Sequence, residues 1–155
     1  MRLILIFSAL LSGVSAYACP DLSGSYTKCS SGMGLRIDQV VKDGNTIYVM
    51  RQRDPNDGTN YEDYISADGL TSTYSEVSSE EYSVDISSKY SCSGNELVND
   101  VVATVREGDE VKELKSQSKM RKEGNKFIFT QSGIIDIVDG GRFVLLDRVD
   151  EIICE

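Results

Sequence analysis

The stretch that decides the fold spans residues 35–50 and reads LRIDQVVKDGNTIYVM. Two runs rich in β-branched and aromatic residues flank the pair Asp43-Gly44. A two-residue type I′ turn needs a positive φ at both central positions, and Asp-Gly is among the pairs that meet this need best. The stretch therefore predicts a β-hairpin with strands over residues 35–41 and 46–50.

The same alternation of short apolar runs and turn residues continues along the chain. Further turn signals occur at residues 68–69, 93–95, 107–109, 124–125 and 139–141. They delimit eight to ten strands, and the connections are too short for the crossover helices of a parallel sheet. We therefore predict an all-β fold, an antiparallel up-and-down meander that closes into a small barrel of 8–10 strands, with a β-sandwich as the alternative.

Two segments are candidates for short helices. They are residues 75–81, which are rich in Ser and Glu, and residues 147–154, where apolar residues have helical spacing. Both segments fit turns or strand ends equally well.

The N-terminus has the pattern of a secretory signal peptide. Arg2 supplies one positive charge, residues 3–11 are apolar apart from one serine, and small residues follow up to Ala18. The apolar run is shorter than the roughly 20 residues that span a bilayer. We therefore expect a signal peptide over residues 1–18, with cleavage after Ala16 or Ala18, and no transmembrane segment.

Residues 19–155 then form a single domain, the β-barrel, that is periplasmic or secreted. An alternative is lipoprotein processing before Cys19. Ala16 and Tyr17 fit that signal poorly, because it favours a Leu-like residue three positions before the cysteine and a small one two before.

Four cysteines remain after residue 18: Cys19, Cys29, Cys92 and Cys154. An even number in an exported chain predicts two disulfides. Residues 23–29 look extended and span about 20 Å, whereas bonded cysteines need Cα atoms within about 7 Å, so Cys19–Cys29 is excluded. Of the two connectivities left, we favour Cys19–Cys154 with Cys29–Cys92, because it ties the two ends together. The chain has no CxxC motif and no histidine, which are the usual elements of a metal-thiolate or zinc site, so we expect no metal.

The segment Asp21-Leu22-Ser23-Gly24-Ser25-Tyr26 resembles the first strand of lipocalin-like (calycin) β-barrels, which opens with Gly-x-Trp. Gly24 matches the glycine, and Tyr26 stands where the family has tryptophan. The chain contains no tryptophan, and the family's distal motifs are not evident. The resemblance implies a barrel with an apolar internal cavity.

The amino-acid composition excludes several classes of function. With no histidine, no Ser-His-Asp or Cys-His catalytic arrangement is possible, and histidine-based metal sites are excluded as well. The chain has no GxSxG, P-loop or GxGxxG motif in the required context. Its net charge of −9 disfavours nonspecific binding to nucleic acid. We therefore expect a non-enzymatic protein with no cofactor and no nucleic-acid partner.

Two acidic features have both a functional and a structural interpretation. Asp136 lies among isoleucines, opposite in phase to Ile135 and Ile137, and we expect it to face solvent rather than a cavity. The loop over residues 54–60 is rich in oxygen ligands. Gly58 comes one residue too early for a calcium loop, so an ordinary turn is expected.

Two further stretches suggest surfaces for binding a partner protein. Residues 112–126 contain six basic side chains, which we expect to be a solvated hairpin that blocks edge pairing. Serine is dense over residues 66–93, and five tyrosines lie in or near that stretch. Tyrosine and serine suit binding loops, and they also suit half-buried strands.

Our leading hypothesis is a protein that holds a small apolar or amphipathic ligand inside the barrel, lined by residues such as Ile37, Val49, Val84 and Phe129. The alternative is a protein-interaction or inhibitor module that acts through the Tyr-rich stretch or the basic hairpin. An enzyme with paired carboxylates ranks third.

Overall fold

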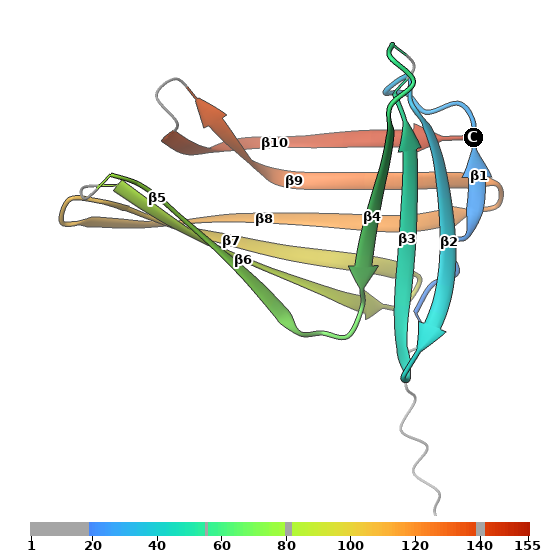
Figure 1. The fold of residues 1–155 in the computed structure, drawn as a ribbon, viewed down its shortest axis with the longest axis horizontal. Coiled ribbons are helices and arrows are strands. Elements are labelled where there is room, and N and C mark those ends of the chain that lie inside the picture. The colour runs from blue at the N-terminus through green and yellow to red at the C-terminus, as the bar shows by residue number, and fades with distance from the viewer. Residues whose placement is uncertain (1–18, 55, 80–81, 139–141) are drawn as a thin grey trace, which may run out of the picture.

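A computed structural model describes residues 19–54, 56–79, 82–138 and 142–155, so the predicted signal peptide lies outside the described residues. The described part forms two antiparallel sheets, which lie across one another (Figure 1). The smaller sheet contains β1 (Gly24–Tyr26), β2 (Gly34–Lys42), β3 (Asn45–Arg53) and β4 (Asn60–Ser66). The larger sheet contains β5 (Thr71–Ser79), β6 (Tyr82–Ser93), β7 (Glu96–Glu107), β8 (Glu110–Glu123), β9 (Lys126–Val138) and β10 (Arg142–Cys154).

Within each sheet the strands follow one another in sequence order, which confirms the all-β class and the antiparallel meander. The ten strands fall within the predicted number. Both helix candidates are extended where they are described: residues 75–79 belong to β5, and residues 147–154 belong to β10. The turn signal at residues 139–141 lies outside the described residues.

The hairpin at residues 35–50 forms as predicted. β2 pairs with β3 from Gly34 opposite Arg53 to Lys42 opposite Asn45. Asp43 has a φ of 52° and Gly44 a φ of 83°, so both central turn residues adopt the positive φ that this turn demands.

The predicted closed barrel does not form, because β4 and β5 belong to different sheets. Between them the chain steps from one sheet to the other. The N–H of Ala67 still donates to the carbonyl of Thr46 in the small sheet (2.9 Å), whereas the N–H of Gly69 donates to the carbonyl of Tyr90 in the large sheet (3.1 Å). The β4–β5 side is therefore open, as in the sandwich alternative.

On the opposite side, backbone hydrogen bonds join the two sheets. The N–H groups of Thr27 and Lys28 donate to the carbonyl of Glu155, and the N–H of Glu155 donates to the carbonyl of Lys28 (2.9, 3.1 and 3.0 Å). The chain just after β1 thus lies beside the end of β10. This is the proximity of first and last strands that closure of a meander requires.

The disulfides correct our favoured pairing. The structure bonds Cys19 to Cys92 and Cys29 to Cys154. The end of β10 does meet the first strand, but it does so at Cys29, beyond the far end of β1. Cys19 precedes β1 and reaches the end of β6 instead. Because Cys19 Sγ is bonded to Cys92, it is not available for the thioether of a lipoprotein.

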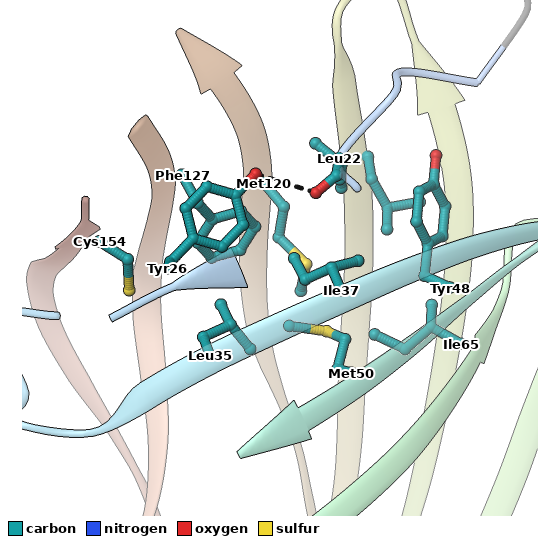
Figure 2. Packing of buried hydrophobic residues seen from close by; sticks show 11 residues of the cluster. Leu22, Tyr26, Leu35, Ile37, Tyr48, Met50, Ile65, Met120, Phe127 and Cys154 are labelled. Atoms are coloured by element: carbon teal, nitrogen blue, oxygen red, sulfur yellow. Dashed lines mark hydrogen bonds between the residues drawn. The ribbon is translucent and has the colours of Figure 1, made fainter. Parts of the chain in front are cut away.

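The main core lies where the sheets cross (Figure 2). Tyr48 is fully buried and donates a hydrogen bond to the carbonyl of Pro20 (2.7 Å). Tyr26 packs against Phe127, with ring centroids 5.5 Å apart, and its hydroxyl donates to the carbonyl of Leu22 (3.0 Å). A Cβ at Gly24 would lie 2.9 Å from the tip of the Tyr26 ring, so the Gly-x-Tyr spacing lets the ring fold back over its own strand.

A second apolar cluster lies at the far end of the large sheet. Its buried residues are Val84, Ala103 and Val105, and Phe143 packs against them. The N–H of Phe143 donates to the hydroxyl of Tyr82 (2.8 Å), which brings the start of β10 against the start of β6.

Two irregularities accompany this approach of β10 to β6. Gly133 in β9 has a φ of 63°, and the register of β10 shifts between Leu146 and Val149. Such irregularities bend strands, so we attribute the turning of β9 and β10 in Figure 1 to them.

We expect a digest of the unfolded, unreduced protein to report the disulfide pairing directly. Trypsin sites after Lys28, Arg36, Lys89, Arg106 and Arg148 place the four cysteines in four different peptides. Mass spectrometry should find the peptide ending at residue 28 linked to residues 90–106, and residues 29–36 linked to residues 149–155. A link between the peptide of Cys19 and residues 149–155 would contradict the structure.

Gly133→Ala should destabilise the fold strongly. An added Cβ would lie 2.5 Å from the carbonyl oxygen of Lys115, and the φ of 63° is unfavourable for alanine. We expect a loss of about 3 kcal/mol or more in the free energy of unfolding. Urea unfolding followed by circular dichroism measures it.

Gly108→Ala is the matched control, because Gly108 also has a positive φ (55°) and nothing lies within 4 Å of an added Cβ. It should lose only about 1 kcal/mol. Equal losses for the two variants would show that the contact with Lys115 is unimportant.

Candidate functional site

A pocket of about 500 Å³ lies between the inner faces of the two sheets. The small sheet contributes Leu35, Met50, Gln52, Asp63, Tyr64 and Ile65. The large sheet contributes Tyr90, Met120, Phe127, Phe129, Ile152 and Cys154, and the loop before β2 contributes Cys29, Ser31 and Met33. The volume lies within the range of roughly 300–1,000 Å³ typical of small-molecule sites.

Strand alternation explains why these side chains converge. On the small sheet, Met50 lies opposite Asp63, and Tyr48 lies opposite Ile65. Since residues two apart point to the same face, Asp63 shares the inward face with buried Ile65. On the large sheet, Met120, Phe129 and Ile152 form one cross-strand row, which is the apolar floor of the pocket.

The next row on the same face of the large sheet is polar. Two residues from the floor, Ser118 lies opposite Gln131, which lies opposite Asp150. Ser118 is buried, and Gln131 Nε2 donates to Ser116 Oγ (3.3 Å). This polar row adjoins the apolar floor on the same face of the sheet but does not line the pocket, and Asp150 pairs with Arg148 (3.2 Å).

Methionine gives the pocket an adaptable lining. Met33, Met50 and Met120 all line it. An unbranched thioether side chain fills irregular space and tolerates occupants of different shape. The exposed side chains of Asp63 and Tyr64 lie on the edge strand β4, on the open side of the molecule.

The four residues expected to line a cavity do not line a common one. Phe129 does line the pocket. Ile37 is 1% exposed in the main core, and Val84 belongs to the second cluster. Val49 is buried, but it lies between Tyr48 and Met50 and so points to the opposite face of β3.

The basic stretch over residues 112–126 forms the β8–β9 hairpin, and each of its six basic side chains has an acceptor. Five form ion pairs with carboxylates: Lys112–Glu110, Lys115–Glu113, Lys119–Glu96, Arg121–Glu123 and Lys126–Glu155. Lys122 Nζ donates to the carbonyl of Ser23 (2.7 Å). The hairpin therefore does not present uncompensated positive charge.

The other sequence candidates lie apart from the pocket. Asp136 is exposed, as expected, and its Oδ1 accepts from the N–H of Ile137 (2.8 Å). In the loop over residues 54–60, Asp54 and Asp57 each accept a backbone N–H two residues later (2.8 Å), which are turn hydrogen bonds. Among the described residues, no group of three or more acidic or cysteine side chains is placed to hold a metal.

The exposed tyrosines do not gather on one face of β4. Tyr61 and Tyr64 are 52% and 68% exposed, but they are three residues apart and therefore point to opposite faces. Tyr64 and Tyr90 both border the pocket. The pocket thus accounts for part of the Tyr-rich stretch.

Asp63 is the one charged side chain among the residues that line the pocket. It lies close enough to Tyr90 to act on it: burial raises the pKa of the Tyr90 hydroxyl, and the negative charge of Asp63 raises it further. The pocket holds one carboxylate, so it lacks the carboxylate pair of a glycosidase. In the sequence, the only signal that Asp63 points inward is its phase with the apolar Ile65.

Comparisons with models of known protein families, with curated proteins and with solved structures found no match for this chain. No helix long and apolar enough to cross a membrane occurs among the residues that the structure describes.

Asp63→Asn should lower the pKa of Tyr90 while leaving it above that of an ordinary tyrosine. The substitution removes the nearby negative charge, whereas burial, the larger cause, remains. Tyrosine labelled with ¹³C at Cζ and followed by NMR against pH measures this. An unchanged Tyr90 pKa would mean that Asp63 does not act across the pocket.

Proposed function

We propose that this protein is a non-enzymatic extracytoplasmic binding protein, and that it holds a small apolar or amphipathic ligand in the pocket between its two sheets. The observation that carries the proposal is the pocket itself. It is a largely apolar space of about 500 Å³ on the inner faces of both sheets, with a few polar side chains among the residues that line it.

The composition of the pocket supports a ligand with an apolar body. Met120, Phe129 and Ile152 form its floor, and Met50 and Ile65 face them from the small sheet. Burial of apolar ligand surface here gains about 25 cal/mol for each Å² removed from water. The lining also includes the polar side chains of Ser31, Gln52 and Asp63, which can receive a polar end, so an amphipathic ligand fits better than a pure hydrocarbon.

Location outside the cytoplasm is supported by two independent features. The sequence of residues 1–18 has the signal-peptide pattern. All four cysteines are joined in two disulfides, which are typical of proteins in oxidising compartments.

We further propose that the architecture is a variant of the lipocalin-like barrel, opened between β4 and β5. Hydrogen bonds run from β5 to β10, across to the chain after β1, and through β2 and β3 to β4. Gly24 and Tyr26 keep the Gly-x-aromatic spacing of the resemblance, with the aromatic ring in the core. The opening between β4 and β5 would give a ligand a lateral entrance.

Ile152→Trp should weaken ligand binding at least tenfold. Because Ile152 lines the pocket, the larger side chain would extend from the floor into the space that the ligand occupies. Fluorescence titration with N-phenyl-1-naphthylamine, a neutral apolar probe, measures the dissociation constant. Thermal unfolding of each variant confirms that it is folded.

Val149→Trp is the control on the same strand, since Val149 is 71% exposed and does not line the pocket. It should bind the probe as the parent protein does. If both tryptophan variants bind as the parent does, or if the parent does not bind at all, the proposed site is wrong.

A further inference from the structure

Asp63 stands apart from the carboxylates around it. Its neighbour Glu62, on the opposite face of β4, accepts a hydrogen bond from Arg51 Nε (2.5 Å). Arg51 also pairs with Asp38, and Glu62 accepts from the hydroxyl of Tyr64 as well. On that outer face of the small sheet, negative charge is compensated by the side chains of the protein itself.

On the inner face of the small sheet, the carboxylate of Asp63 is not compensated in this way. Asp63 lies opposite Met50 and in phase with Ile65, so its carboxylate borders the apolar pocket. Within the described residues, no basic side chain forms an ion pair with it, and none lines the pocket. The pocket therefore presents one negative charge with no cation of the protein beside it.

The surroundings of Asp63 favour an organic cation over a bare metal ion. Tyr90 borders the same pocket, and Phe127 and Phe129 also line it. The faces of aromatic rings attract cations within about 6 Å, and ammonium groups with an apolar body benefit most from this attraction. A metal ion would want several oxygen ligands, and Asp63 is the only carboxylate in the lining.

We infer that the ligand is a hydrophobic cation, an organic amine whose ammonium group lies beside Asp63 and whose apolar body fills the pocket above Met120, Phe129 and Ile152. This inference rests on the proposed function and names its ligand class. The net charge of −9 on the chain adds a long-range attraction for cations and repels fatty-acid anions. The raised pKa of Tyr90, to which the charge of Asp63 contributes, agrees with a negative potential across the pocket.

The test compares three compounds that share one alkyl chain: n-octylammonium, n-octanol and n-octanoate. The assay measures how well each compound displaces N-phenyl-1-naphthylamine from the purified parent protein at pH 7 and low salt. We expect octylammonium to bind about threefold to tenfold more tightly than octanol, because the ion pair and the aromatic contacts are partly exposed to solvent. Octanoate should bind most weakly.

Asp63→Asn should remove most of the preference for octylammonium and leave octanol binding unchanged. Asp136→Asn is the matched control: it removes the same charge from an exposed position on β9 that does not line the pocket. It should keep the preference of the parent protein. This pair separates the local effect of Asp63 from that of the overall charge.

Each outcome decides the matter. If octanol binds but octylammonium has no advantage, the ligand class is wrong while the pocket remains a binding site. If the full advantage persists in Asp63→Asn, the inference that Asp63 holds the ammonium group is wrong. If the advantage falls equally in both variants, overall charge explains it and Asp63 has no special role. If neither the probe nor any octyl compound binds the parent protein, the proposed function fails, and this inference fails with it.

Discussion

The Cys29–Cys154 bond and the hydrogen bonds beside it hold the first and last segments of the described chain together, and the rest of the architecture depends on this seam. It closes a loop with a sequence separation of 125 residues. On the chain-entropy account, such a closure removes about 5 kcal/mol of unfolded-state freedom. The same seam fixes one side of the small sheet against the end of the large one. The two sheets separate on the opposite side, between β4 and β5, where they share no backbone pairing.

The space between the two sheets is filled by side chains in one region and left open in another. Where the sheets cross beside the seam, Leu22, Tyr26, Ile37 and Tyr48 fill the space between them and leave little exposed surface. The pocket extends from the seam itself, where Cys29 and Cys154 line it, to Asp63 on β4, and its lining of methionines, aromatic rings and one carboxylate leaves the space unfilled. The second apolar cluster supports the far end of the large sheet independently, through the bend at Gly133 and the contact of Phe143 with Tyr82. The large sheet can thus extend past the small one without the small sheet covering its whole inner face.

Sequence reasoning succeeded where the deciding forces are local. The Asp43-Gly44 turn, the ten-strand meander and the exposure of Asp136 follow from turn chemistry and alternation, which act within a few residues. It failed where two distant segments had to be placed together. The cysteine pairing required knowing which end of β1 meets β10, and the four residues chosen for a cavity required knowing which strand face turns inward. The alternation along a strand does not say which of the strand's two faces the other sheet will cover. Val49 was therefore expected on the inner face of β3, and it lies on the outer face.

The sequence by itself determined the class of fold, the strand order and the presence of four cysteines able to form two bonds, because these follow from periodicity, turn residues and composition. Only the tertiary structure decided that the meander divides into two sheets, that Cys29 rather than Cys19 meets Cys154, and that Asp63 borders an apolar pocket. The physical reason is the same in each case. Hydrogen bonding between neighbouring strands is specified locally, whereas the packing of one sheet on another depends on the summed burial of side chains that lie far apart in the chain.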